Sequence, residues 1–237
     1  MKLSAPIHNL KRQARLLARQ EQVSLHQALD QIASREGFSR WSLLISRFDG
    51  VSDAEKAAQS FQPGDLVLLG GRPGHGKTRI GLAIAYSKMA AGHDAYFFTL
   101  EYHAQELNAR LGDMGFDNQS PNANLVIDTS DDICAEYITS NMGIARSGAV
   151  VVIDYLQILD QRRSTPDLDV QLKQLQSFAR KQEVTLILIS QIDRAFEHSG
   201  RDFPGLVDVR QPNPIDLRRF NRSCFVHNNK LRWNKAA

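Results

Sequence analysis

Residues 71–78 have the types and the spacing that a phosphate-binding loop needs. They read Gly-Arg-Pro-Gly-His-Gly-Lys-Thr and satisfy the pattern GxxxxGK[ST]. Glycine permits backbone angles at which successive N–H groups turn toward a phosphate, and the helix that follows adds the positive end of its dipole. We expect Lys77 to reach the terminal phosphates and the Thr78 hydroxyl to ligate a magnesium ion. The predicted ATP-binding residues are Gly71, Arg72, Pro73, Gly74, His75, Gly76, Lys77 and Thr78.

The residues on both sides of this loop support the same prediction. An apolar run at 66–69 precedes the loop, and apolar residues at helical spacing follow it through 80–85. A strand, a glycine loop and a helix in this order form a phosphate cradle. An accidental glycine-rich turn would not have this setting.

Three polar residues stand at the ends of other apolar runs. Asp154 ends a valine-rich run, where a carboxylate can hold magnesium together with Thr78; the alternative is a turn former. Glu101 follows an aromatic run and can orient or deprotonate an attacking water, unless it only stabilises the start of a helix. Gln191 ends a third run, where an amide can hydrogen-bond a γ-phosphate and report its loss to the next loop.

Strand and helix patterns alternate from residue 62 onward. Solidly apolar strands separated by helices favour an α/β fold with a parallel sheet that is covered on both faces. Ligands of such sheets bind at the carboxyl ends of the strands, where the polar residues above stand. The expected strands are 65–70, 94–99, 124–128, 149–153, 184–189 and 223–227. The expected helices are 77–91, 102–114, 131–146 and 167–182.

The N-terminal residues have a different pattern. Residues 1–50 are expected to form a small helical unit, with Ser24 as the N-cap of its second helix and a third short helix beginning at Ser39. Residues 51–61 are expected to form a linker helix, and residues 62–237 the larger domain. Three short helices with basic outer faces can read DNA or serve as a docking module, and both interpretations stay open.

Composition and charge limit the class of protein. The chain has 237 residues, 42% of them hydrophobic and 23% charged, which is ordinary for a soluble globular protein. The net charge is +3, but residues 1–50 hold eight Lys and Arg against four Asp and Glu, and residues 201–237 hold eight against three. Basic ends suit a polyanionic partner such as nucleic acid, although solvated helix faces would carry the same charges.

Several features are typical of a cytoplasmic protein. Two widely separated cysteines, Cys134 and Cys224, indicate neither a disulfide framework nor a zinc site and fit a reducing compartment. The apolar runs fall well short of the roughly 18 residues that span a bilayer, and the N-terminus has no hydrophobic signal core. We therefore expect a cytoplasmic location and no membrane partner.

The motifs, taken together and in this order, resemble the RecA-like ATPase core of DnaB-type replicative helicases. The resemblance covers about residues 62–210 and implies a RecA-like P-loop NTPase core preceded by the small helical unit. The segment that begins at Asp154 is far more specific than the phosphate loop, and it matches recombination or clock-type RecA-fold ATPases less well. The matching segments are 71–78, Phe98-Thr99-Leu100-Glu101, Asp154-Tyr155-Leu156-Gln157 and Ser190-Gln191-Ile192-Asp193-Arg194.

The resemblance also implies roles for individual residues. Glu101 would be the general base, Asp154 the magnesium partner and Gln191 the γ-phosphate sensor, acting with Lys77. A homo-oligomeric ring or filament is implied, because in this fold the neighbouring subunit completes the site. The candidates for contacts with single-stranded DNA are Arg162, Arg163, Arg201 and Arg210, although all four can be ordinary surface charges. The trans-acting basic candidates are Lys230 and Arg232.

Three departures from the family bear on function. We expect the family's primase-interacting N-terminal domain to be missing, with the helical unit of residues 1–48 in its place, and residues 211–217 do not follow the family's usual sequence. The family's arginine finger, worth roughly 10³–10⁵ in rate, has only the pair Lys230 and Arg232 as a counterpart, in surroundings that do not match.

Two hypotheses of function follow from the sequence. The first is a Mg-dependent, helicase-like ATPase that acts on single-stranded DNA as an oligomer in DNA replication. The alternative is a nucleotide-gated interaction or regulatory module with little hydrolysis and no unwinding. The weak match around the arginine finger favours the alternative, whereas Glu101 argues against it, because a binding switch has less use for a base.

Overall fold

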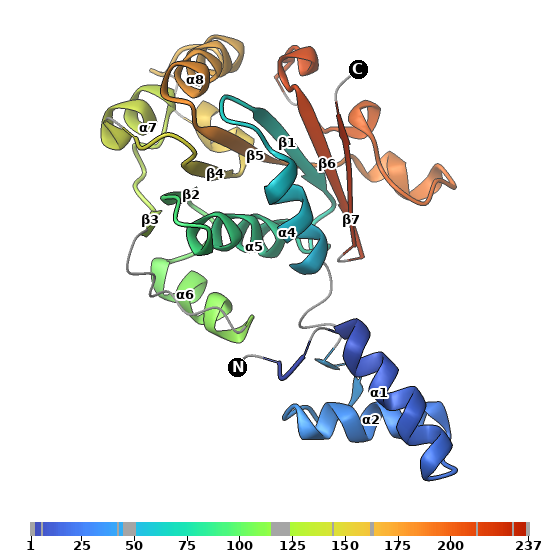
Figure 1. Cartoon of the computed structure of the whole chain (residues 1–237). Coiled ribbons are helices and arrows are strands. Elements are labelled where there is room, and N and C mark those ends of the chain that lie inside the picture. Colours follow the sequence, from blue (N-terminus) through green and yellow to red (C-terminus); the bar gives the residue numbers. More distant parts are fainter. Residues whose placement is uncertain are drawn as a thin grey trace. The chain divides into compact units, whose positions relative to one another are not determined.

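A mainly parallel sheet is the centre of the computed structural model (Figure 1). Within the described residues it has seven strands, in the order β3-β2-β4-β5-β1-β6-β7. All pairs among β1 to β6 are parallel, and β7 pairs antiparallel with β6. This confirms the predicted α/β class with a mainly parallel sheet. The strands are β1 (Leu66–Gly71), β2 (Ala95–Thr99), β3 (Leu125–Asp128), β4 (Val150–Asp154), β5 (Thr185–Gln191), β6 (Arg222–His227) and β7 (Lys230–Lys235).

The chain contains two compact units. The smaller comprises residues 1–49 with 111–117, and the larger comprises residues 50–110 with 118–237. The sheet belongs to the larger unit. The structure describes residues 3–5, 7–41, 43–44, 51–114, 124–143, 145–161, 164–211, 213–228 and 230–235.

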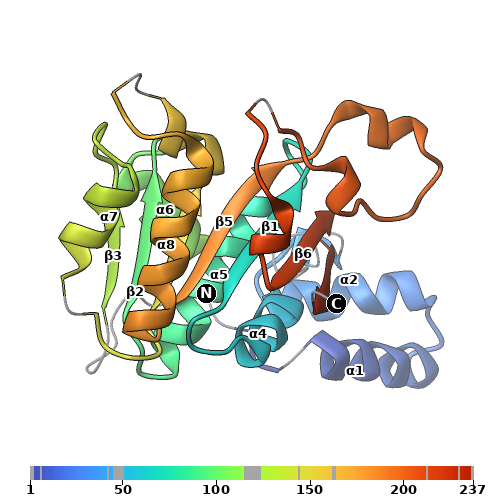
Figure 2. The same ribbon diagram turned by 90° about the horizontal axis from the view of Figure 1, so that it is seen from above.

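Helices cover both faces of the sheet. α5 packs against the central strands on one face with α4 beside it, and α7 and α8 lie on the other face, as Figures 1 and 2 show. The segment expected as a linker helix is α4, which packs on α5 within the larger unit. In the part of the chain that is described, no helix has the length and apolar character to span a membrane. The helices are α4 (Val51–Ser60), α5 (Lys77–Ala90), α6 (Ala104–Asp113), α7 (Ala135–Met142) and α8 (Leu168–Gln182).

The central strands are apolar because both of their faces are covered. Every residue of β1 and of β4 is buried, as parallel strands between two helical layers require. The helix after the phosphate loop packs especially closely on this sheet. A Cβ built at Gly81 of α5 would lie 3.1 Å from Ile189 Cδ1 and 3.1 Å from Val152 Cγ1. The start of α5 is thus fixed relative to β4 and β5.

The smaller unit contains two helices, α1 (Ile7–Gln20) and α2 (Leu25–Arg35). Ser24 is confirmed as the N-cap of α2, because its hydroxyl accepts from the Gln27 N–H while the Gln27 side chain accepts from the Ser24 N–H. Of the third helix expected from Ser39, residues 42 and 45–50 lie outside the described residues. The buried apolar residues of this unit are Leu10, Ala14, Leu17, Ala28, Ile32, Ala33, Phe38, Trp41 and Leu44.

Two predictions about elements are wrong. The helix expected at 131–146 is shorter, because Cys134 caps its start with a thiol that accepts the Tyr137 N–H, and Gly143 ends it with a φ of 54°. The final strand β7 was not predicted at all. It is reached through Asn228, whose φ of 49° lies in the left-handed region that asparagine tolerates in a tight turn.

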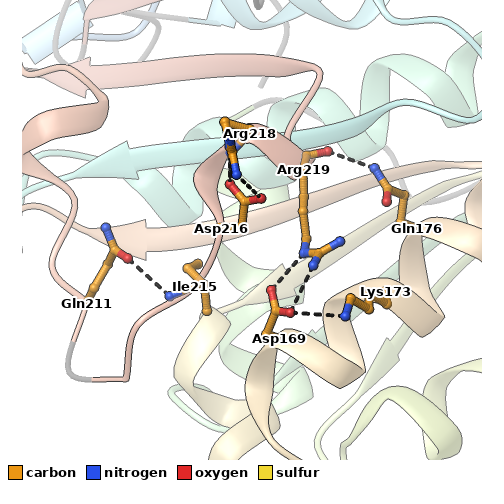
Figure 3. A network of polar contacts seen from close by, with 8 residues as sticks. All are labelled: Asp169, Lys173, Gln176, Gln211, Ile215, Asp216, Arg218 and Arg219. Carbon is orange, nitrogen blue, oxygen red and sulfur yellow. Dashed lines mark hydrogen bonds and ion pairs between the residues drawn. The ribbon is translucent and has the colours of Figure 1, made fainter.

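Polar contacts with α8 anchor the segment that leads into β6 (Figure 3). The Arg219 guanidinium donates two hydrogen bonds to the Asp169 carboxylate, at 2.7 and 2.9 Å, and so lowers the pKa of Asp169. Gln176 Nε2 donates to the Arg219 carbonyl at 2.9 Å, and Lys173 Nζ lies 3.6 Å from Asp169 Oδ2. These contacts fix the path of the chain just after residues 211–217.

Close packing of α5 on the sheet gives a stability prediction. Gly81→Leu should lower the free energy of unfolding of the larger unit by about 1–3 kcal/mol, because Ile189 and Val152 leave no room for a side chain. Urea unfolding followed by circular dichroism measures the change. Ser177→Leu in α8 is the control, since this position of the same unit is exposed and leaves room for a larger side chain. Equal losses in the two variants would contradict the packing described here.

Candidate active site

Four neighbouring strands end at one edge of the sheet, and each carries a predicted site residue. β1 leads into the phosphate loop, β4 ends at Asp154, β5 ends at Gln191 and β2 is followed by Glu101. The register pairs Gly71 with Gln191 and Thr99 with Asp154. Because parallel strands present their carboxyl ends at the same edge, the fold brings these segments together although they are far apart in the sequence.

Glycine is required at two positions of the phosphate loop. A Cβ on Gly71 would lie 2.8 Å from Lys77 Cγ and 2.9 Å from the Val226 carbonyl oxygen, so the lysine stem crosses the space that a side chain would fill. Gly76, the N-cap of α5, has a φ of 94° in the left-handed region. Pro73 and Gly74 form the exposed tip of the loop. The loop is therefore a cradle that backbone N–H groups can line.

Lys77 lies within the loop with its ammonium group turned back on it. Its Nζ donates to the Arg72 carbonyl oxygen at 3.1 Å. Burial lowers the pKa of Lys77, and the charges of Asp154 and Glu101 oppose that effect. A desolvated ammonium that is bonded to one carbonyl keeps further donors for an anion. The position suits a group that neutralises phosphate charge.

Thr78 and Asp154 are directly joined. The Thr78 hydroxyl donates to Asp154 Oδ2 at 2.7 Å, and Asp154 is only 1% exposed. Burial raises the pKa of Asp154 to about 6 and the Glu101 charge adds to this, whereas the Thr78 hydrogen bond and Lys77 oppose it. A carboxylate in this place lacks a strong neutralising partner within the described chain.

This pair fits the ligand preference of magnesium. Within the described residues no group of three or more His, Cys, Asp and Glu side chains could hold a metal. Mg²⁺ is usually bound through one or two protein oxygens together with substrate phosphates and water, rather than in a protein cage. One hydroxyl and one buried carboxylate at 2.7 Å are the donor set that this mode of binding needs.

Glu101 is an exposed carboxylate at the same edge. Its backbone N–H donates to Thr99 Oγ1 at 3.1 Å, which fixes the turn that follows β2. Its charge acts on the pKa of both Lys77 and Asp154, so the carboxylate lies within electrostatic range of the loop. An accessible carboxylate next to a phosphate cradle can accept a proton from a water molecule.

Arg210, a predicted DNA contact, lies beside Gln191. Its backbone N–H donates to the Gln191 carbonyl at 2.8 Å, and its guanidinium lies 3.5 Å from Gln191 Oε1. The Arg210 carbonyl in turn accepts from Gln157 Nε2 at 3.5 Å. Gln191 and Arg210 line both a cavity of about 190 Å³, with Tyr155 and Gln157, and a cavity of about 390 Å³, with Arg72. The two residues thus act as one structural unit.

Arg72 connects the phosphate loop to the segment after β5, residues 192–210. Its Nε donates to Glu197 Oε1 at 2.7 Å and its Nη1 to the Ile192 carbonyl at 3.1 Å. In the same segment, Arg201 forms an ion pair of 2.5 Å with Asp208. Part of the positive charge expected for DNA is therefore neutralised within the chain. The other two candidates, Arg162 and Arg163, lie outside the described residues.

The trans-acting candidates Lys230 and Arg232 are both exposed on β7. They alternate with the buried Leu231 and so share one face of the strand. The guanidinium carbon of Arg232 lies 4.4 Å from the centroid of the Phe203 ring of the same chain. The pair is thus presented on an edge strand, with one member stacked on an aromatic ring.

Sequence reasoning missed two residues that contact the loop. Glu197 binds Arg72, and the ring of His227 lies 4.8 Å from that of His75. Neither belongs to a recognisable motif, because each acts through a partner that is distant in the sequence. The position of His227 at the end of a predicted strand was the one local signal available.

The family of the chain follows from comparison with known proteins. Residues 49–115 and 113–219 match the model of the DnaB-like helicase C terminal domain. The chain belongs to this family. The match extends over well more than half of the chain and includes every predicted site residue except Lys230 and Arg232.

Curated relatives and solved structures agree with this assignment. The chain is 25% identical over 199 residues to the replicative DNA helicase DnaB of Geobacillus stearothermophilus, covering 70% of this chain and 44% of the relative. It is 26% identical over 207 residues to a probable replicative DNA helicase of Trieres chinensis, covering 73% and 46%. The chain thus spans just under half the length of these relatives.

Two solved structures share the fold. One is a DnaB-like replicative helicase, described with its primase interactions, at a TM-score of 0.54 and 17% identity over 97% of this chain and 74% of that chain. The other is an isolated ATPase domain at a TM-score of 0.55 and 19% identity, covering 74% and 73%. These likenesses confirm the predicted RecA-like fold.

Burial of Asp154 gives a prediction for the protein without nucleotide and divalent cation. With EDTA at pH 8, Asp154→Asn should raise the free energy of unfolding by about 1–3 kcal/mol, because it removes a buried charge. The folded pKa lies above the ordinary value, so the unfavourable contribution appears as the pH rises from about 4 to 6 and is complete above that range. Urea unfolding at pH 8 and at pH 4 measures it.

The two pH values provide the internal control. At pH 4 the Asp154 carboxyl is largely protonated in the folded chain and about half protonated in the unfolded chain, so little of the unfavourable contribution is left and the two proteins should differ little. An asparagine variant that is less stable than the parent at pH 8 would show that the charge is stabilised by its surroundings.

Proposed function

We propose that this chain binds ATP with Mg²⁺, hydrolyses it, and acts on single-stranded DNA in the cytoplasm as a homo-oligomeric ring or filament. Membership of the DnaB-like helicase C-terminal family and the names of the relatives, which are replicative DNA helicases, support a helicase-like ATPase. The chain spans just under half the length of those relatives. DNA binding, oligomerisation and any unwinding activity are therefore part of the proposal for this chain.

The observation that carries the proposal is the contact between Thr78 and Asp154. Asp154 is buried and accepts a hydrogen bond from the Thr78 hydroxyl. A bound cation could take the place of this hydroxyl proton and would offset the charge of the buried carboxylate. A bound Mg²⁺ would neutralise phosphate charge at this point. A structural aspartate at a strand end would not need the combination of burial, Thr78 and Lys77.

The other residues of the site divide the remaining work. Lys77 would neutralise the terminal phosphates with the donors that remain after its bond to the Arg72 carbonyl. Glu101 would accept the proton of the attacking water and orient it. Gln191 would hydrogen-bond the γ-phosphate, and its contact with Arg210 would pass the loss of that phosphate to the following segment.

The contacts with a neighbour and with DNA rest on fewer observations. Lys230 and Arg232 are exposed on an edge strand, as a group that serves a neighbouring subunit must be. The Arg232 guanidinium stacks on the Phe203 ring, and it would have to leave this ring in order to reach across an interface. Arg201 is engaged with Asp208, so Arg210 is the described arginine with more freedom to contact a DNA phosphate.

A second candidate function is a nucleotide-gated interaction module with little hydrolysis. The stacking of Arg232 on Phe203 favours it, because an arginine held in its own chain does not complete a neighbour's site. In this case ATP would order the segment after Gln191 without rapid turnover. The two candidates share the same nucleotide site and differ in catalysis and assembly.

The role of Glu101 gives a direct test of hydrolysis. Glu101→Gln should bind ATP as the parent does and lose about 10²–10⁴ in kcat, because the general base is removed while the loop is intact. ATPase assays with and without single-stranded DNA, at several protein concentrations, measure this. Glu106→Gln is the matched control, since this exposed carboxylate of α6 accepts the His103 N–H, which an amide can also do. Turnover unaffected by Glu101→Gln would exclude the base role.

A mixing experiment tests the trans-acting arginine. Arg232→Ala and Lys77→Ala should each be nearly inactive alone, but a mixture should regain ATPase activity, because an intact loop in one subunit then meets an intact Arg232 in the next. Activity is measured as a function of mixing ratio, with mass measurement in ATP and Mg²⁺ to follow assembly. A mixture no more active than its components, or a chain that stays monomeric, would favour the interaction module.

A further inference from the structure

His227 lies next to the phosphate loop because of the strand order. β6 pairs in parallel with β1, and the register places Val226 opposite Gly71. His227 is therefore the residue that follows the partner of the first loop residue, at the carboxyl edge of the sheet. It also begins the tight turn into β7, since it pairs with Lys230 across the hairpin. One residue thus adjoins both the loop and the hairpin that carries the trans-acting candidates.

Two contacts join this hairpin to His75 of the phosphate loop. The rings of His75 and His227 lie 4.8 Å apart between centroids with 30° between their planes, which is a tilted stack. The backbone N–H of Asn228 donates to His75 Nδ1 at 3.1 Å. Burial lowers the pKa of His75, with the charges of His227, Arg72 and Lys77 adding to the effect and Glu197 opposing it. A neutral ring is what this acceptor nitrogen requires.

His227 is also enclosed by rings of the segment after β5. Phe196 lies 5.5 Å away and Phe203 lies 6.1 Å away, both edge-on. The Arg232 guanidinium stacks on Phe203 from β7. Aromatic contacts of this kind contribute beyond the burial of area, and they fix relative orientation. The loop, the hairpin and the segment after β5 therefore meet at one imidazole.

A buried nitrogen of His227 argues against a role in which the ring only fills space in the core. Its Nδ1 is buried and has no hydrogen-bond partner among the described residues. An apolar ring would fill the same place without an unsatisfied polar atom. A histidine at this place is explained if its Nδ1 forms a hydrogen bond in another state of the loop. It is also explained if the polar edge of its ring interacts with the neighbouring rings.

We propose that His227 is a positioning residue that couples the phosphate loop to the β6–β7 hairpin, so that nucleotide bound at the loop sets the position of Lys230 and Arg232. The inference rests on the proposed function, since it requires a nucleotide at the loop. The coupling has three steps. Phosphate contacts fix the backbone of the loop, and His75 moves with that backbone. The contacts of His75 with His227 and Asn228 then move the turn of the hairpin.

Trp233 gives a direct readout of the hairpin. The chain has two tryptophans, Trp41 in the smaller unit and Trp233 on β7. In a Trp41→Phe parent, saturating ATPγS with Mg²⁺ should change the Trp233 emission. Calorimetry on the same proteins measures nucleotide affinity separately. His227→Ala should cut the emission change at least threefold and weaken binding about three- to tenfold, as expected for loss of an aromatic contact.

Three further variants separate coupling from folding. His227→Phe keeps a ring between His75 and the two phenylalanines and should retain most of the emission change. His75→Ala should reproduce the effect of His227→Ala, and the double variant should be no worse than either single one, because both remove the same contact. His198→Ala, an exposed histidine of the same segment as Phe196, is the matched control and should behave as the parent.

The outcomes distinguish this inference from the proposed function. A parent that binds nucleotide with Trp233 silent, or a His227→Ala protein with the full emission change, overturns the coupling and leaves nucleotide binding in place. Additive losses in the double variant also overturn it, because they show that the histidines act independently. A parent that binds no ATPγS overturns the proposed function and the inference together.

Discussion

A buried carboxylate at the end of a strand is the constraint on which this site depends. Asp154 is almost fully enclosed, and among the described residues the Thr78 hydroxyl and the charges of Lys77 and Arg110 offset its burial in part. Such a group is tolerated where a cation completes its surroundings. The sheet makes this possible because β4 lies between β2 and β5, so the glutamate after one neighbour and the glutamine at the end of the other flank the same point.

The phosphate loop is held by two segments outside the central strands, the segment after β5 and the β6–β7 hairpin. Arg72 fastens it to the segment after β5, and His75 fastens it to the β6–β7 hairpin. A loop with such ties cannot rearrange alone. If nucleotide binds as proposed, a change at the phosphates would act on two neighbouring parts of the chain, the segment after β5 and the β6–β7 hairpin.

Several arginines of the larger unit already interact with groups of the same chain. Arg201 pairs with Asp208, Arg210 contacts Gln191 and Arg232 stacks on Phe203. Charge counted along a sequence therefore overstates the positive surface that is free for a polyanion. In either candidate function, a partner that binds these three arginines would exchange internal interactions for external ones.

The sequence by itself determined the features that are local. The glycine spacing of 71–78, the apolar runs that end in Asp154 and Gln191, and the cap at Ser24 each depend on neighbours within a few residues, so pattern alone identified them. The alternation of strands and helices likewise predicted a parallel sheet, because both faces of its central strands must be apolar.

Only the tertiary structure decided what depends on strand order. Nothing local in the chain says that β6 lies beside β1, yet this order sets His227 against the loop and gives Arg232 its place. The last strand escaped prediction because an exposed edge strand needs few apolar residues, and Lys230–Lys235 has only Leu231 and Trp233. Contacts such as Arg210 with Gln191 join residues far apart in the chain, and such long-range pairing leaves no trace in a local pattern.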